Sequence, residues 1–219
     1  MNLSDFDYYL PHELIAQEPV SRRDISRLLV LPKCGAKIEH RHFKDLVDYL
    51  RPDDILVINE TRVIPARLFG VKEATGAAIE VLILKRLGHN RWEALVRPGK
   101  KATIGTKLIF GEGLLEGLIL SNTSFGGRVI EFSYQGAFEE ILGQIGVMPL
   151  PPYIKKPLFD QQRYQTIYAR QAGSAAAPTA GLHFSEELLE QIVNMGVTLV
   201  PVLLHVGLGT FRPVQVEDI

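Results

Sequence analysis

The sequence predicts a mixed-sheet α/β domain with a small all-β barrel domain inserted into it. Two continuously apolar runs, residues 55–58 and 197–204, have the composition of strands that are covered on both faces. Five short β-rich runs lie between residues 78 and 134, separated by Gly- and Asn-rich turns, as in small barrels and sandwiches. Gly70 on one side and four prolines between 149 and 157 on the other bracket these runs.

Length and composition narrow the possible classes of protein. The 219 residues, 46% of them hydrophobic, can bury one large core or one core and a smaller one. A net charge of −1 gives no global attraction to nucleic acid or membranes. The single cysteine, Cys34, excludes an internal disulfide and a zinc site built on cysteines. The N-terminus lacks the pattern of a signal peptide and no apolar run could span a bilayer, so we expect a cytoplasmic protein.

The barrel domain is expected over residues 68–152, and the α/β domain over 1–67 and 153–219. Alternation within the second β-rich run directs Trp92 inward, which favours a place in the barrel core. The predicted barrel strands are residues 78–85, 91–97, 106–110, 114–121 and 128–134.

Helices and a hairpin are expected around this barrel. The pattern predicts strands over 27–31 and 38–42, and helices over 43–50, 137–145 and 185–195. For the last helix, Ser185 is a suitable N-cap and Gly196 a suitable residue after its end. Its expected buried face consists of Leu188, Leu189, Ile192 and Val193.

Charge is unevenly distributed along the barrel segment. Residues 85–107 hold seven Lys or Arg and one Glu, a local charge of +6, and residues 112–140 hold one Arg and five Glu, a charge of −4. The basic segment has two interpretations that the sequence does not separate: a contact for nucleic-acid phosphates, or a solvated hairpin.

Polar residues follow the first apolar strand. Asn59, Glu60, Thr61 and Arg62 stand at the carboxyl end of residues 55–58, where open α/β sheets bind ligands. They are also ordinary turn residues with one solvated arginine, and taken alone the segment favours this second interpretation.

Two small-residue loops within residues 163–213 each carry a histidine. AAAPTAGLHF, with His183, precedes a predicted helix, and its loop amides could bind an anion. LHVGLGTF, with His205, follows a predicted strand, but GLG lacks the third glycine and the following helix of a dinucleotide site. Structural histidines and acid/base histidines are both compatible with this arrangement.

Long blocks of the chain resemble the S-adenosylmethionine:tRNA ribosyltransferase-isomerase family of queuosine biosynthesis. The blocks include YYLPHELIAQEPVSRRDISRLLVL, DDILVINETRVIPARLFG, PLPPYIKK, RYQTIYARQAGSAAAPTAGLHF and LHVGLGTFRPV, in the family's order. The chain departs from the family pattern at Glu60, where Asp is usual, and at Ala175, where Val is usual. Family members continue well beyond residue 219, so we expect an N-terminal fragment.

The resemblance implies a reaction with two substrates. S-adenosylmethionine would donate its ribosyl moiety to 7-aminomethyl-7-deazaguanine at the wobble position of tRNA. The products would be epoxyqueuosine-tRNA, adenine and methionine. An α/β domain with a small barrel, a monomer and a site without a metal ion are also expected from the family.

The site residues are carried over onto the matching motifs. His183 and His205 are the catalytic acid/base candidates, because histidine titrates near neutrality. The candidates for substrate binding are Asn59, Thr61, Arg62, Arg67, Gln165, Thr166, Thr179, Ala180, Gly181, Gly207, Gly209 and Thr210. The rival interpretations are a non-enzymatic RNA-binding module and a small-molecule hydrolase.

Overall fold

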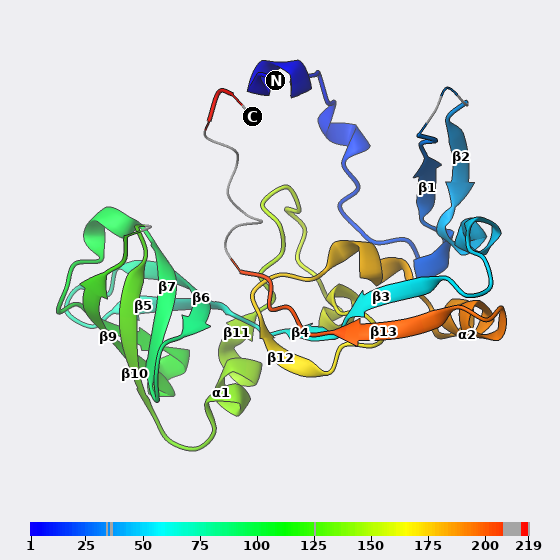
Figure 1. Ribbon diagram of the computed structural model, residues 1–219. Coiled ribbons are helices and arrows are strands. Elements are labelled where there is room, and N and C mark those ends of the chain that lie inside the picture. Colours follow the sequence, from blue (N-terminus) through cyan, green and yellow to red (C-terminus); the bar gives the residue numbers. More distant parts are fainter. Residues whose placement is uncertain (34, 36, 125, 208–215, 219) are drawn as a thin grey trace.

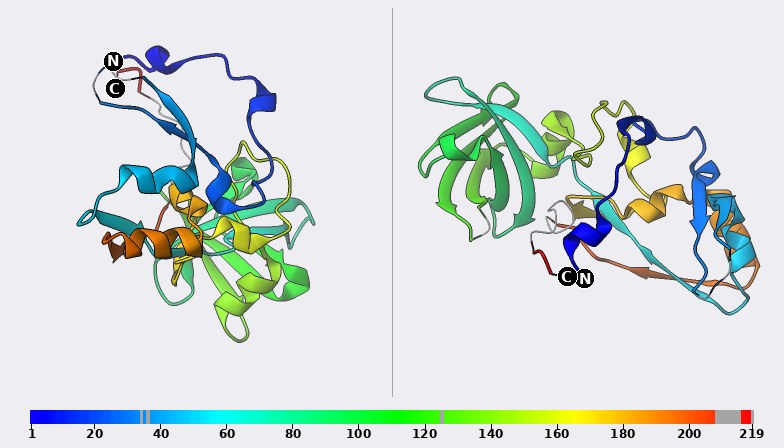
Figure 2. Two further views of the ribbon diagram at one scale, coloured as in Figure 1. Left: turned by 90° about the vertical axis from the view of Figure 1, so that its right-hand side faces the viewer. Right: turned by 90° about the horizontal axis from the view of Figure 1, so that it is seen from above.

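The protein consists of two parts that lie side by side, as the computed structural model shows (Figures 1 and 2). The structure describes residues 1–33, 35, 37–124, 126–207 and 216–218. A β-barrel forms one part. Strands β3 (Ile55–Asn59) and β13 (Thr198–Val202) with helix α2 (Glu186–Asn194) lie at the far end of the other part (Figure 1). Strands β4 (Thr61–Val63) and β12 (Gln171–Ser174) lie between this end and the barrel.

The barrel is a closed antiparallel sheet of six strands in the order β5-β6-β7-β10-β9-β8, with β8 pairing back onto β5. This confirms the predicted barrel, and five of its strands match the predicted runs. Strand β5 was not predicted, because Gly70 interrupts its apolar pattern. The strands are β5 (Arg67–Lys72), β6 (Ala78–Arg86), β7 (Arg91–Arg97), β8 (Lys107–Phe110), β9 (Leu115–Asn122) and β10 (Arg128–Tyr134).

Helix α1 (Phe138–Ile145) covers one end of the barrel and adds to its core. Its first residue, Phe138, stacks on Trp92 with ring centroids 5.0 Å apart. Trp92 is only 8% exposed, which confirms the predicted core position. Strand β11 (Gly146–Val147) then pairs with the start of β5, so the chain leaves the barrel beside the point where it enters.

The second part is built from three two-stranded sheets. Strand β3 (Ile55–Asn59) runs parallel to β13 (Thr198–Val202), and β4 (Thr61–Val63) runs parallel to β12 (Gln171–Ser174). Strands β1 (Arg27–Val30) and β2 (Glu39–His42) form the predicted hairpin. Across the described residues the only α-helices are α1 and α2, so the chain is mostly β and the predicted α/β class is confirmed only in part.

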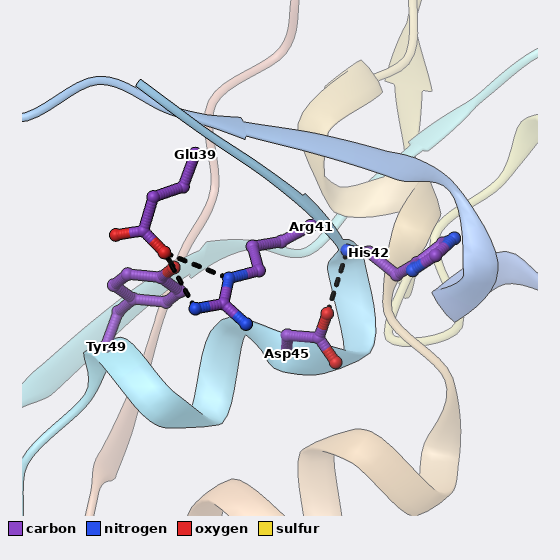
Figure 3. A network of polar contacts seen from close by, with 5 residues as sticks. All are labelled: Glu39, Arg41, His42, Asp45 and Tyr49. Carbon is purple, nitrogen blue, oxygen red and sulfur yellow. Dashed lines mark hydrogen bonds and ion pairs between the residues drawn. The ribbon is translucent and has the colours of Figure 1, made fainter. Parts of the chain in front are cut away.

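Short 3-10 helices connect these elements, and one of them replaces the α-helix predicted at 43–50. This helix, Phe43–Tyr49, is held to the hairpin by a polar network (Figure 3). Glu39 accepts hydrogen bonds from Arg41 Nε and Nη2 at 3.0 and 2.7 Å and from Tyr49 Oη at 3.2 Å. The other 3-10 helices are Leu3–Phe6, His12–Leu14, Arg23–Ile25, Gly99–Lys101, Gly111–Gly113, Gln161–Tyr164 and Thr179–His183.

No helix of the described residues is both long and apolar enough to cross a bilayer.

Helix α2 (Glu186–Asn194) begins as predicted, with Ser185 Oγ accepting from the amide of Leu188 at 3.2 Å. Leu188 and Ile192, one helical turn apart, are buried against the 43–49 helix and β3. Val193 was predicted on this face but is 48% exposed, because it projects to the side of the Leu188–Ile192 line.

The β3–β13 sheet is covered on one face only, so the prediction of two covered faces is wrong in this structure. Leu56 and Leu199 pack under α2, whereas Ile55 and Val57 are 66% and 59% exposed. The reason is that α2 and the 43–49 helix pack on the face that carries Leu56 and Leu199, while Ile55 and Val57 point to the other face.

Replacing Ile192 with Ala should lower the free energy of unfolding by about 2–5 kcal/mol, because a fully buried side chain leaves a cavity. The matched control, Val193→Ala, should cost about 0.5 kcal/mol or less at its exposed position. Urea unfolding followed by far-UV circular dichroism measures both. Equal losses for the two variants would contradict the observed orientation of α2.

Candidate functional site

A cleft of about 540 Å³ lies between the barrel and the β4–β12 sheet, and it contains one of the predicted histidines. Its size is that of a small-molecule site. The barrel and α1 supply Leu84, Lys85, Arg86, Trp92, Phe138, Glu139 and Leu142, and the other part supplies Ile64, Ala172, Gly173, His205, Val206 and Gly207. Two other hollows of the described surface, at residues 2–7 with Glu217 and at residues 113–144, contain no predicted site residue.

Hydrogen bonds from the β3–β4 junction fix the position of His205. Asn59 Nδ2 donates to Leu204 O at 2.9 Å, and its Oδ1 accepts from Leu204 N at 3.1 Å. Thr61 Oγ1 lies 2.8 Å from His205 Nδ1, and Thr61 is only 1% exposed. One ring nitrogen is therefore engaged by a buried hydroxyl, and Nε2 is the nitrogen left for a ligand.

Gly173 makes room for this imidazole. A Cβ at position 173 would lie 2.7 Å from both Cε1 and Nε2 of His205, and its φ of +151° is also unfavourable for other residues. The next residue, Ser174, accepts from Val206 N at 2.9 Å through its hydroxyl. Strand β12 thus holds the residue after His205, and Asn59 of β3 holds the residue before it.

The barrel wall of the cleft combines aromatic and charged groups. The guanidinium of Arg86 lies 5.5 Å from the centre of the Trp92 ring, within the range of a cation–π contact. Arg86 also lies 3.8 Å from Glu139. Lys85 is exposed and forms no ion pair with a described residue. The sequence placed these cations in the basic segment but gave no signal that they face a histidine loop.

His183 lies outside this cleft. Its ring packs against Phe43 at 5.3 Å, in a half-buried place near Arg23 and Arg163. Burial lowers its pKa, and the positive charge of Arg163 lowers it further, so the neutral imidazole is favoured. The structure therefore does not bring the two predicted catalytic histidines into one cleft.

Besides Asn59 and Thr61, three further predicted binding residues are occupied by contacts within the fold. Gln165 is buried, and its amide accepts from Val63 N at 2.9 Å and donates to Val63 O at 2.7 Å. Arg67 Nε lies 3.1 Å from Glu80 Oε1. Arg62 donates to Gln162 Oε1 at 3.2 Å.

The remaining predicted residues fall into three groups. Thr166 is buried, and its hydroxyl has no hydrogen-bond partner in the described part of the chain. It lies beside the buried Gly181, where a Cβ would be 2.9 Å from Thr166 Cγ2. Thr179 and Ala180 are exposed in the 3-10 helix, and Gly207 lines the cleft. Gly209 and Thr210 lie outside the described residues.

The sequence interpretation missed Gly173, Phe138 and Glu139 as cleft residues. The only available signal was the place of Gly173 within the RQAGSAAAP block. Among the described residues, no three His, Cys, Asp or Glu side chains gather in the manner of a metal site.

Gly173→Ala should displace the His205 ring and lower the free energy of unfolding by about 1–3 kcal/mol, since it adds an atom to a tight contact at positive φ. The matched control is Gly143→Ala in α1, where the added methyl meets open space and should stabilise by about 0.5–1 kcal/mol. Chemical unfolding and the NMR shifts of the His205 ring test this. An unchanged ring environment in Gly173→Ala would contradict the contact.

His183 should make the stability of the protein depend on pH. Its folded-state pKa lies below the ordinary value of 6.5, so the unfolded state binds a proton more readily. Wild type should therefore lose stability relative to His183→Gln as the pH falls below about 6.5. Urea midpoints of both proteins at about pH 7.5 and about pH 5.5 measure the effect. If the difference in urea midpoint between the two proteins were the same at both pH values, the predicted contribution of His183 would be excluded.

Comparisons with known proteins agree with the motifs. The family model described as "Queuosine biosynthesis protein" matches residues 3–219. The chain is 72% identical to a Pelotomaculum thermopropionicum protein and 63% identical to a Desulforamulus reducens protein, both named S-adenosylmethionine:tRNA ribosyltransferase-isomerase. In each comparison all of this chain aligns, and it spans 64% of the relative's length.

A solved structure is also similar in sequence. The S-adenosylmethionine tRNA ribosyltransferase of Thermotoga maritima is 38% identical, over 92% of this chain and 58% of that one, with a TM-score of 0.38. The family assignment depends on the sequence match, which covers nearly the whole chain. With its motif blocks in the shared order, this chain belongs to the queuosine biosynthesis protein family.

Proposed function

We propose that this chain forms part of an S-adenosylmethionine:tRNA ribosyltransferase-isomerase. The enzyme would transfer the ribosyl moiety of S-adenosylmethionine to 7-aminomethyl-7-deazaguanine at the wobble position of tRNA. Epoxyqueuosine-tRNA, adenine and methionine would be released. Family membership and the names of relatives up to 72% identical support this proposal, and the chain spans 64% of their length.

The observation that carries the proposal is the cleft that joins His205 to Lys85, Arg86 and Trp92. A reaction of this class needs a group that moves protons, cationic groups for a carboxylate or phosphate, and an apolar wall for a purine. Residues from both parts of the chain meet these needs at a single place.

In this proposal His205 moves a proton at the carbon beside the sulfonium, which the positive sulfur acidifies. If Nδ1 carries the proton and donates it to Thr61 Oγ1, Nε2 is a free acceptor and can act as a base. If Thr61 donates to Nδ1 instead, Nε2 carries a proton and can act as an acid. Thr61 is thus a positioning residue that holds the ring through Nδ1 in either tautomer.

The other predicted residues have supporting roles in the proposal. Asn59 and Gln165 position the backbone around His205 and Val63. Arg62, Thr166, Thr179, Ala180, Gly181, Gly207, Gly209 and Thr210 remain proposed substrate contacts. Arg67 would need to leave Glu80 to bind an anion. His183, neutral near pH 7, remains a second acid/base candidate outside the cleft.

The proposal includes the organisation of the chain. Residues 1–67 and 153–219 would form a discontinuous α/β catalytic domain, and residues 68–152 the inserted barrel domain. The pairing of β11 with β5 supports an insertion, because the two ends of the barrel segment are neighbours. We infer a cytoplasmic, monomeric enzyme that uses S-adenosylmethionine as a co-substrate and tRNA as its partner.

Adenine release is the test of the proposed function. This chain and, in parallel, the full-length Pelotomaculum relative are incubated with S-adenosylmethionine and precursor-bearing tRNA. Adenine should form only when both substrates are present. Salt-sensitive tRNA binding by both proteins without adenine release would favour the RNA-binding module instead.

Loss of His205 should lower kcat by about 10²–10⁴-fold, the contribution typical of a positioned acid or base. The variant is His205→Ala, made at the equivalent position of the full-length relative and assayed by adenine release. The control is the exposed His40, replaced in the same way. Wild-type turnover in the His205 variant would eliminate the assignment.

A further inference from the structure

The seven cations of residues 85–107 divide into two groups in the structure. Arg86, Arg91 and Lys107 form ion pairs with Glu139, Glu131 and Glu73, at 3.8, 2.9 and 3.6 Å respectively. The other four, Lys85, Arg97, Lys100 and Lys101, form no ion pair with any described carboxylate. The positive charge that remains available is therefore concentrated at a few positions.

Three of the four unpaired cations belong to one exposed turn. Arg97 ends β7, and Lys100 and Lys101 occupy the 3-10 helix that follows; we call residues 97–101 the basic turn. Glu80 lies directly across the sheet from Arg97, but its carboxylate contacts Arg67 at 3.1 Å. The charge of the basic turn is thus poorly compensated.

Arg128 holds the basic turn in a defined conformation. Its guanidinium donates to Gly99 O at 2.9 Å and to Ala102 O at 2.8 Å, on either side of the two lysines. It also donates to Gly126 O and Gly127 O at 3.2 and 2.9 Å, which ties the turn to the neighbouring loop. Ala102 is fully buried behind the lysines. A turn ordered in this way loses little conformational freedom when it binds.

The basic turn and the cleft lie at opposite ends of β7. Arg91 and Trp92 begin the strand beside the cleft, and Arg97 ends it. Seven residues at about 3.3 Å each separate the two places by roughly 20 Å. A small molecule held in the cleft could not contact both, whereas an extended polyanion could.

We propose that Arg97, Lys100 and Lys101 bind backbone phosphates of the tRNA whose modified base enters the cleft. This inference rests on the proposed function, which makes tRNA the substrate. The exposed position of the three side chains suits phosphates that follow one another along a strand, since each can be contacted without an enclosing pocket. Arg128, whose three guanidinium nitrogens each donate to carbonyl groups, orders the turn and does not bind phosphate.

The experiment measures tRNA binding without S-adenosylmethionine, so its readout is separate from adenine release. Lys100→Gln/Lys101→Gln should raise the Kd for tRNA about tenfold at about 0.1 M salt. The slope of log K against log salt should fall in magnitude by about 1.4–1.8, because each of the two phosphates that the variant no longer neutralises contributes about 0.7–0.9. Arg91→Gln/Lys107→Gln removes the same charge from paired positions of the same segment and should change Kd by about twofold or less.

The charge-retaining variant Lys100→Arg/Lys101→Arg should bind tRNA within about twofold of wild type, which separates loss of charge from loss of folding. Circular dichroism and Trp92 fluorescence check the fold of every variant. Equal weakening by both Gln doubles, no weakening by either, or no tRNA binding by wild type would overturn the proposal. The proposal would also be overturned if Lys100→Gln/Lys101→Gln kept its tRNA binding but lost binding to phosphatidylserine vesicles, because the basic turn would then bind lipid phosphates. Wild-type tRNA binding with the expected variant pattern but no adenine release would support this inference and defeat the proposed function.

Discussion

The segment from Asn59 to Val63 is held by two stretches of chain that are more than 100 residues away in sequence. Asn59 binds the backbone of Leu204, Thr61 binds the His205 ring, and Val63 is bound on both backbone groups by Gln165. The groups around Thr61 and Val63 are half-buried or buried, so leaving them unpaired would cost about 1–3 kcal/mol, whereas the Asn59–Leu204 bonds are exposed. The cleft, the parallel strand pairs and the position of His205 all depend on this junction.

The barrel could be predicted from the sequence because its signals are local. Each strand alternates between buried and exposed residues, and glycine-rich turns separate one strand from the next. The pattern of β5 is broken by Gly70, where a side chain would overlap Phe110, so that strand had no clear local signal. The coverage of the β3–β13 sheet was mispredicted because composition reports that a strand is apolar but not how many layers pack on it.

The sequence indicated individual site residues but not which of them lie together in space. The motif blocks indicated His183 and His205 equally, and only the fold shows that His205 lies in the cleft while His183 packs on Phe43. Asn59 and Gln165 are polar residues in the right motifs, yet their side chains hold backbone groups. Likewise, the sequence shows that the basic segment contains seven cations. Which of them lie beside a carboxylate is determined by the strand register, as for Arg91 and Glu131. Long-range pairing carries this information, and no local pattern encodes it.

The ladder between β5 and β11 joins the first and last residues of the barrel segment, with Arg67 opposite Val147 and Leu68 opposite Gly146. Neighbouring strands lie about 5 Å apart, so a peptide of only a few residues could connect these two positions directly. The loop-closure entropy of such a connection is small and changes slowly with length. Removing or exchanging the barrel would therefore cost the rest of the chain little free energy. The cleft residues Lys85, Arg86 and Trp92 would be lost or replaced together with the barrel. In evolutionary terms, one wall of the cleft can be exchanged as a module while the histidine loop remains unchanged.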